Sequence, residues 1–501
     1  MKQLIHGGRL LTAGRLDGSF ADILVDGDAV VAVLPPGESV TEDARRIDAT
    51  NRLLIPGLVN AHTHATVHLA RGLADRWSLE LLLNAYPWTA GGRTLEYKYL
   101  SAYIGAVEMV RKGCTACYDL VAELPAPSIE GIDAVARAYH DIGLRAVIAP
   151  MMADVSFYRA IPGLLDAMPP DLRERAEAVR LQPFDVSLAT CRKLLDGWSW
   201  DRDQLRPALG PTIPHHCSDD FIIGCRDLAR EHGIGVQMHL AESKVQAVVG
   251  QKRYGTTLTG HLHKLGLLAP NFTAAHAIWL DDDDIARLAD SGAAVAHNPG
   301  SNLKLGSGLA RTRRLRDRGI AFGIGTDGCL SSDNLNMFEA MRLAAFGSRI
   351  QGPDPREWLS AAEAFEAATV GGARALGLET RIGRLEAGFK ADVVFLDLTS
   401  INYVPLNDPL LNVVFCEDGT GIDRVMIGGT IVVAEGRVLG VDMPKLAATA
   451  AAAVERLTQV NAGARAFVEA LEPLVADYCV GLAREPYHVH RWCGHTDEDR
   501  T

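Results

Sequence analysis

Long hydrophobic runs are missing from this chain of 501 residues, and acidic residues outnumber basic ones. No stretch approaches the roughly 18 consecutive apolar residues that a membrane span needs. The opening residues, MKQLIHGGRLLTAGRL, lack the apolar core and cleavage site of a signal peptide. The formal net charge of -12 is spread along the chain, which argues against the basic face that binds nucleic acid. We therefore expect a cytoplasmic protein with neither membrane nor nucleic acid as a partner.

A disulfide framework is also missing. The nine cysteines are odd in number and scattered, which suits reduced thiols. Cys114 and Cys117 have the C-x-x-C spacing of redox and zinc sites, but no second pair accompanies them and their surroundings are apolar. We interpret this pair as part of a packed core.

What is present in the middle of the chain is an alternation of apolar runs and amphipathic stretches. The strand-like runs are RAVIAPMM, LRPALGP, GVQMHLAE, FTAAHAI, AAVAHNP and IAFGIGTDG. A helix is expected in DDDDIARLADSG, because aspartates favour a helix N-terminus and Gly292 can end it. Almost wholly apolar strands between helices predict parallel strands buried on both faces. Residues 56–380 are long enough for a closed (β/α)8 TIM barrel; a doubly wound sheet is the alternative, but no G-x-G-x-x-G follows an early strand.

Short β-rich runs with turn signals mark the two flanks of this middle region. Residues 1–55 have the pattern of a small antiparallel sheet, and a similar texture returns in residues 381–440, where Gly428 and Gly429 predict a hairpin turn. We expect the two segments to form one small β-sandwich domain together.

The last segment, residues 441–501, begins with an Ala-rich run that predicts one or two amphipathic helices, packed on the barrel or on a second subunit. The tail that follows holds a set of metal-competent side chains: His488, His490, Cys493 and His495. A second metal site is one interpretation. Their spacing fits no zinc-finger pattern, so an ordinary packed tail is the other.

Two histidines one residue apart end an apolar run in PGLVNAHTHA. In an extended strand His62 and His64 point to the same side, so they could chelate one metal ion or form hydrogen bonds within a core. The ends of later strands carry further titratable or metal-competent side chains: His239, His276, His297 and Asp327. Because functional residues of a barrel lie at the C-terminal ends of its strands, this pattern favours a metal site.

Three imidazoles and one carboxylate form a donor set that suits Zn²⁺ and also accepts Fe²⁺ or Mn²⁺. Such an ion lowers the pKa of a bound water from about 15.7 to about 7. Glu242 lies three residues after the ligand His239 and can carry the water's proton onward, unless it is a surface carboxylate. His276 is left to orient the water or to polarise the intermediate.

These residues resemble those of the metal-dependent amidohydrolase superfamily, in its branch of cytosine, guanine and adenosine-type deaminases and triazine hydrolases. The blocks that carry the resemblance are PGLVNAHTHA, HLAES, AAHAIWL, AHNPGSNLKLGSG and GIGTDG. The resemblance implies a (β/α)8 barrel with a β-sandwich built from both terminal regions. It also implies a homo-oligomer, and one divalent metal ion held by His62, His64, His239 and Asp327.

The reaction that the resemblance implies is hydrolytic deamination of an amino-substituted N-heterocycle. Metal-activated water attacks the ring carbon, Glu242 protonates the ring nitrogen, Asp327 takes a proton from the water, His276 assists, and ammonia leaves. The same machinery could instead displace chloride or alkylamine from a triazine, or hydrolyse an amide. A non-catalytic scaffold would have eroded ligands, whereas here each one is present.

Candidate substrate contacts lie in loops after the first ligands. Arg71, Trp77 and Trp88 fall in a segment that resembles the loop covering the pocket of thioadenosine and adenosylhomocysteine deaminases, although loop aromatics can also simply pack. Asn302 is expected near the barrel mouth. Thr212 in GPTIPHHCS stands where thioadenosine deaminases typically have a histidine, which leaves free purine, pyrimidine and triazine bases open beside nucleosides.

Overall fold

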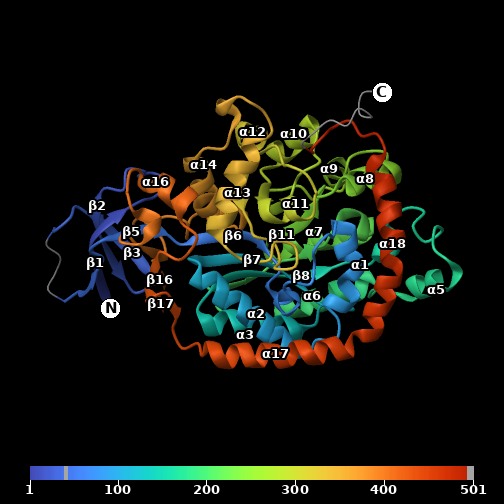
Figure 1. The fold of residues 1–501 in the computed structure, drawn as a ribbon, viewed down its shortest axis with the longest axis horizontal. Helices are drawn as coiled ribbons and strands as arrows, with labels where there is room; N and C mark the ends of the chain where they lie inside the picture. The colour runs from blue at the N-terminus through green and yellow to red at the C-terminus, as the bar shows by residue number, and fades with distance from the viewer. Residues whose placement is uncertain (39–42, 493–501) are drawn as a thin grey trace.

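The structure is a computed structural model, and it describes residues 1–38 and 43–492. A β-rich lobe lies on the left of Figure 1, a barrel of strands and helices occupies the centre, and two long C-terminal helices follow the lower and right edges of the barrel. No described helix is both long and apolar enough to cross a membrane.

The barrel has eight strand positions in two parallel sheets. The first sheet contains β6 (Leu58–Thr63), β7 (Cys114–Ala122), β8 (Arg145–Met152), β9 (Leu205–Pro207) and β10 (Gly210–Pro211), with β9 and β10 sharing one position. The second contains β11 (Val236–Leu240), β12 (Phe272–His276), β13 (Ala294–His297) and β14 (Ala321–Ile324). Leu209 links the sheets through main-chain hydrogen bonds to Gly235 and Gln237, and the Asp327 amide donates to the His62 carbonyl across the other seam, at 3.0 Å. The predicted (β/α)8 barrel is confirmed.

Helices connect and cover the barrel strands, and one short helix, α16 (Pro409–Leu411), lies in the segment of the β lobe. The ranges before the fifth strand position are α1 (Leu79–Thr89), α2 (Leu95–Arg111), α3 (Ile129–Ile142), α4 (Phe157–Ala160), α5 (Pro170–Ala178), α6 (Phe184–Asp196) and α7 (Asp219–His232). Those after it are α8 (Lys244–Tyr254), α9 (Leu258–Lys264), α10 (Asp282–Ser291), α11 (Pro299–Lys304), α12 (Thr312–Asp317), α13 (Met337–Arg349), α14 (Ala361–Glu366), α15 (Gly372–Ala375) and α16 (Pro409–Leu411). As predicted, α10 begins after aspartates, in a capping box of Asp281 and Asp284, and ends at Gly292 with φ +71°.

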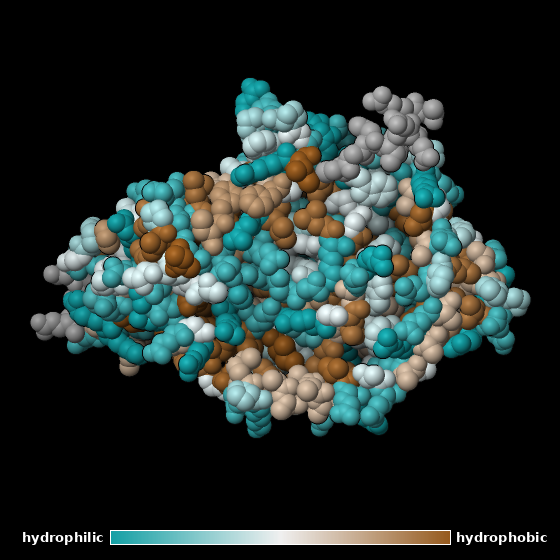
Figure 2. All heavy atoms as spheres, viewed as in Figure 1, coloured by the Kyte–Doolittle hydropathy of each residue, from teal (hydrophilic) through white to brown (hydrophobic). Residues whose placement is uncertain are grey.

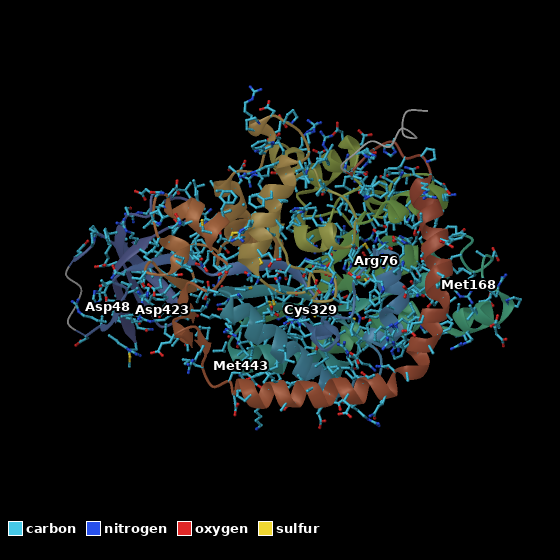
Figure 3. All side chains as sticks on the ribbon, in the orientation of Figure 1. Asp48, Arg76, Met168, Cys329, Asp423 and Met443 are labelled. Carbon is cyan, nitrogen blue, oxygen red and sulfur yellow. The ribbon has the colours of Figure 1, made fainter. Side chains whose placement is uncertain are left out.

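The β lobe is one nine-stranded sheet built from both flanks of the barrel. Its strands are β1 (Lys2–Leu10), β2 (Phe20–Asp26), β3 (Ala29–Leu34), β4 (Arg45–Asp48), β5 (Arg52–Pro56), β15 (Val393–Asp397), β16 (Ile422–Ile427), β17 (Thr430–Ala434) and β18 (Arg437–Val438). Antiparallel pairing of β5 with β15 joins the two flanks, and Figure 3 shows Asp48 and Asp423 in the same lobe.

One detail of the sequence prediction for the β lobe is wrong. The first five strands are not all antiparallel, since β4 and β5 both pair in parallel with β1. After the β2–β3 hairpin the chain crosses to the other edge of β1, and a crossover of this kind returns a strand in the same direction. The predicted turn at Gly428 and Gly429 is confirmed between β16 and β17.

The Ala-rich segment forms two helices that pack on the barrel of the same chain. α17 (Met443–Val460) buries Ala453 and Leu457 against Leu69 and Leu100. α18 (Ala462–Arg484) packs its apolar face against α1 and α8.

The domain boundaries given above, which divide the chain into residues 1–55, 56–380, 381–440 and 441–501, stay a prediction.

Candidate metal centre and active site

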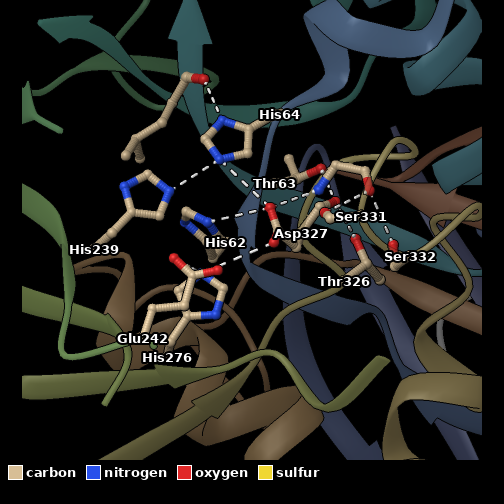
Figure 4. A network of polar contacts seen from close by, with 12 residues as sticks. His62, Thr63, His64, His239, Glu242, His276, Thr326, Asp327, Ser331 and Ser332 are labelled. Carbon is tan, nitrogen blue, oxygen red and sulfur yellow. Dashed lines mark hydrogen bonds and ion pairs between the residues drawn. The ribbon is translucent and has the colours of Figure 1, made fainter. Parts of the chain in front are cut away.

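Four histidines and two carboxylates converge on one point at the C-terminal end of the barrel strands (Figure 4). His62 lies in β6 and His64 directly follows it, His239 lies in β11, His276 ends β12, and Asp327 follows β14. The His64 and His239 Nε2 atoms are 3.1 Å apart, and Asp327 Oδ1 lies 3.5 Å from His62 Nε2 and 3.4 Å from His64 Nε2. Two overlapping groups in this cluster have metal-ligand geometry: His62, His64 and His239, and His62, His276 and Asp327.

The hydrogen bonds of the three histidines determine which ring nitrogen faces the centre. The Nδ1 atoms of His62, His64 and His239 contact oxygen acceptors: Gln237 Oε1 at 2.6 Å, the Leu120 carbonyl at 2.7 Å and the Thr212 carbonyl at 2.8 Å. An acceptor requires that Nδ1 carries the proton, so each Nε2 presents a lone pair to the shared space. Two lone pairs that face each other across 3.1 Å repel unless a cation lies between them. The donor set therefore fits a divalent metal ion.

Charge states in the cluster also suit metal ligands. Burial, with His62 nearby, lowers the pKa of His64 to about 4, and burial with three neighbouring histidines holds the pKa of His239 well below its usual value. Burial alone would raise the pKa of Asp327, but the neighbouring imidazoles of His62, His64 and His276 outweigh it and hold that pKa well below its usual range. Neutral imidazoles and an ionised carboxylate are the forms that bind metal.

Glu242 and His276 face each other beside the proposed ligands. Glu242 is buried, its Oε2 has no hydrogen-bond partner, and this atom lies 3.6 Å from His276 Nε2. Burial first, then the charges of Asp327 and Glu80, raise the pKa of Glu242 well above its usual value. A carboxyl group that holds its proton in a dry cavity is able to deliver it to a bound ring.

The backbone is strained where these side chains leave their strands. His276 has φ +69° and Asp327 has φ +60°, a region that side-chain-bearing residues rarely occupy. Such conformations cost about 1–3 kcal/mol each and persist where the surrounding structure enforces them. Here they aim both side chains at the same point.

A cavity of about 460 Å³ opens from this cluster. His64, His239, Glu242 and Asp327 form its inner end. Most of its other walls are apolar, and these include Leu79, Leu82 and Leu83 of α1 together with Leu124, Met152, Phe157, Leu181 and Leu330. Such a cavity suits a largely flat or apolar small molecule with a few polar groups directed at the metal end.

Of the residues predicted to contact the substrate, the structure places one in the cavity wall and four elsewhere. Thr212 lines the cavity, whereas Arg71, Trp77, Trp88 and Asn302 are outside the set of described residues that line it. Trp77 and Trp88 pack edge to face, with ring centroids 6.4 Å apart. The Arg71 guanidinium forms an ion pair with Glu108 of α2 instead of facing the cavity.

Asn302 has a different contact from the one expected. Its Oδ1 accepts a hydrogen bond from His276 Nδ1 at 2.9 Å, so it orients the histidine rather than a substrate in this structure. Gln237, which holds His62, was missed, although it lies two residues before His239 and therefore points to the same side of β11. His216 was noted only as a neighbour of Thr212, and it lines the cavity.

The remaining histidines do not join the cluster. His297 is buried and stacks on Phe322, with ring centroids 5.5 Å apart. In the tail, His488 pairs with Asp281 at 2.9 Å, while Cys493 and His495 lie outside the described residues. Within residues 1–38 and 43–492, the groups with metal-ligand geometry are all at the barrel mouth, so the second metal site gains no support there. Cys114 and Cys117 are buried in the main core, as expected.

The geometry defines a barrel hydrolase with a metal-competent histidine–aspartate centre. The sequence pattern of the amidohydrolase family matches residues 53–432. The chain belongs to this family.

Curated relatives match nearly end to end. The chain is 33% identical over 459 residues to a 5'-deoxyadenosine deaminase of Methanothermobacter thermautotrophicus, covering 91% of this chain and 98% of the relative. It is also 33% identical over 435 residues to a 5-methylthioadenosine/S-adenosylhomocysteine deaminase of Thermococcus kodakarensis, covering 86% and 94%.

Solved structures share the fold of this chain. An adenosine deaminase from Xanthomonas campestris with bound zinc superposes with a TM-score of 0.79 at 29% identity, covering 91% of this chain and 98% of that one. An atrazine chlorohydrolase from Arthrobacter aurescens in complex with zinc gives a TM-score of 0.80 at 27% identity, covering 90% and 99%.

Proposed function

We propose that this protein is a zinc-dependent deaminase of adenosine-type nucleosides. The observation that carries the proposal is the unpartnered Glu242 carboxyl group, which lies in a largely apolar cavity beside a cluster of histidines and Asp327 with metal-ligand geometry. The deaminase relatives and the zinc-containing adenosine deaminase structure support both the reaction and the metal. Zinc is favoured over iron for this reason, since the nitrogen and oxygen donors would accept either.

The metal ligands in this proposal are His62, His64, His239 and Asp327. When bound, zinc supplies a strongly acidified water as the nucleophile. Asp327 Oδ1 faces His62 and His64, while Oδ2 lies 3.8 Å from His276 Nε2 and can accept a proton from the attacking water. His276 donates from Nδ1 to Asn302, so its Nε2 is an acceptor that can orient the attacking water.

Glu242 transfers the proton that the reaction needs at the ring. It protonates the ring nitrogen next to the carbon under attack, and the amino group then leaves as ammonia with a proton taken from the water. The balance is one water consumed and one ammonia released, with a carbonyl in place of the amine. Because the residues hold the tetrahedral carbon more tightly than the flat ring, the barrier falls.

The shape of the cavity supports a nucleoside whose sugar carries an apolar 5' group. Its volume of about 460 Å³ exceeds what a free base requires, and leucines form much of its wall. The relatives named for 5'-deoxyadenosine and 5-methylthioadenosine are consistent with this choice. The free bases that Thr212 left open are thereby less favoured.

A second candidate is displacement of chloride or alkylamine from a triazine. The observation in its favour is the atrazine chlorohydrolase structure, which is as similar in fold as the adenosine deaminase. Only the cavity walls would differ between the two reactions, because the water is activated in the same way.

Product analysis on a substrate panel separates these candidates. We expect zinc-loaded protein to release ammonia from 5'-deoxyadenosine and 5'-methylthioadenosine faster than from adenosine, guanine or cytosine. The apolar wall gives the reason, since a buried hydroxyl without a partner costs about 1–3 kcal/mol. Chloride or alkylamine release from triazines without any ammonia from nucleosides would replace the deaminase by a triazine hydrolase.

We also propose a homo-oligomer in the cytoplasm. Large apolar side chains are exposed at Ile401, Val404 and Leu411 beside α16, and Figure 2 shows apolar residues in that region and along α17. Surfaces of this kind are typical of subunit contacts. Every cysteine in the described part of the chain is a free thiol, which supports a reducing compartment.

A further inference from the structure

The tail that sequence analysis left open lies across the loops of the barrel mouth. We call residues Tyr487 to Trp492 the C-terminal arm. Tyr487 and Trp492 both pack edge to face on Trp279, with ring centroids 6.3 and 5.0 Å away, and His488 pairs with Asp281. The arm therefore covers the loop that follows His276.

Arg491 makes the densest set of contacts in the arm. Its Nε donates to the Ile278 carbonyl at 2.9 Å and its Nη2 donates to the Leu280 carbonyl, both in the loop after β12. Its own carbonyl accepts from the Leu309 amide at 2.8 Å. Arg491 is only 9% exposed, so these carbonyl acceptors replace water around a buried guanidinium. One residue thus ties the loop after β12 to the loop after α11.

Trp492 adds further contacts between the arm and the barrel loops. Its Nε1 donates to the Gly306 carbonyl at 2.9 Å, and the Lys244 ammonium lies 5.4 Å from its ring centroid. Lys244 begins α8, two residues after Glu242. The arm therefore contacts segments next to Glu242, His276 and Asn302, which lie after β11, in β12 and in α11.

A short chain of hydrogen bonds connects Trp279, on which the arm packs, to His276. Trp279 Nε1 donates to the Ser307 carbonyl at 2.8 Å, and the Ser307 amide donates to the Asn302 carbonyl at 2.9 Å. The side chain of Asn302 then holds His276 Nδ1 at 2.9 Å. The two loops that the arm joins directly follow β12 and α11, the strand and helix that hold His276 and Asn302.

We propose that Arg491 is a positioning residue for catalysis, which sets the His276–Asn302 bond by holding together the loops that follow β12 and α11. This inference rests on the proposed function for the role of His276. Arg491 touches neither the cavity nor the metal ligands, so its removal acts only through the loops. The arm is accordingly part of the active site, although it comes from the far end of the chain.

The test is a double-mutant cycle of Arg491→Ala with Asn302→Ala. We expect Arg491→Ala to lower kcat by about tenfold to hundredfold, the range for small misplacements of a catalytic group, with KM and zinc content unchanged. Arg491→Lys should recover part of the loss, and Arg456→Ala, on the exposed side of α17, serves as the matched control. If the arm acts through Asn302, the double variant should be little slower than the slower single variant.

Amide hydrogen exchange gives a readout that does not depend on activity. In Arg491→Ala, the amides of residues 277–281 and 305–309 should exchange faster, with the Leu309 amide foremost because it loses an ordered acceptor. If Arg491→Ala fails to fold, Trp492→Phe, which removes only the donor to Gly306, should show a smaller change in the same direction in both assays.

Wild-type kcat in Arg491→Ala, or losses that add in the double variant, would overturn the inference. Unchanged exchange in both loops would overturn it as well. Failure of the proposed function has a different signature: the wild-type protein would release no ammonia from any nucleoside, while the exchange result would still report on the arm.

Discussion

Glu242→Gln is expected to lower kcat for ammonia release by about 10³-fold, within the range that a general acid–base group contributes. Glutamine has the same shape but cannot deliver a proton to the ring nitrogen. Because Glu242 Oε2 makes no hydrogen bond, the substitution breaks no protein hydrogen bond at that atom. KM and zinc content should therefore stay close to those of the wild-type protein.

A matched control for this variant is Glu417→Gln. Glu417 is fully buried, and its Oε1 accepts from the Gly419 and Gly421 amides in a loop outside the cavity. Glu417→Gln should leave kcat unchanged, so a loss confined to Glu242→Gln separates proton transfer from the general cost of replacing a buried carboxyl group. Full activity in Glu242→Gln would remove the proton-transfer role.

His62→Ala is expected to abolish zinc binding and turnover together. His62 is fully buried, and its Nε2 has no partner other than the site itself. Its loss should exceed the 10- to 100-fold, or about 1.4–2.7 kcal/mol, that changes to supporting residues around a metal cost. Zinc measured by elemental analysis after dialysis and ammonia release measured on the same sample provide the comparison.

The control for His62→Ala is His140→Ala. His140 lies outside the site, where its Nδ1 contacts Gln204 Oε1 at 3.0 Å. This variant should keep both zinc and activity. A His62→Ala protein that retains a full complement of zinc would contradict the assignment of His62 as a ligand, whatever its activity.

The barrel and its metal cluster could be predicted because the sequence features that specify them lie within single strands. A parallel strand buried on both faces needs a wholly apolar run, and the residue at its C-terminal end must face the mouth. His239 and Asp327 each stand at or just beyond such an end, and the alternation of a strand gives His62 and His64 the same direction. The same rule would have found Gln237.

The loop contacts could not be predicted in this way. Whether Arg71 reaches a substrate depends on Glu108, which lies on α2 and forms an ion pair with the Arg71 guanidinium. Trp77 and Trp88 pack on each other, and nothing in their spacing distinguishes that outcome from stacking on a ring. Parallel pairing of β1 with β4 and β5 likewise depends on a crossover that strand propensity does not specify.

The most direct measurement is a zinc titration of metal-free protein with the best nucleoside of the panel. Protein stripped with a chelator should release no ammonia, and activity should rise in proportion to added Zn²⁺ until one equivalent per chain is bound. Further zinc should add nothing, because the described residues supply one set of ligands. Ammonia release without metal, or a plateau reached only at two equivalents, would contradict a single-zinc deaminase.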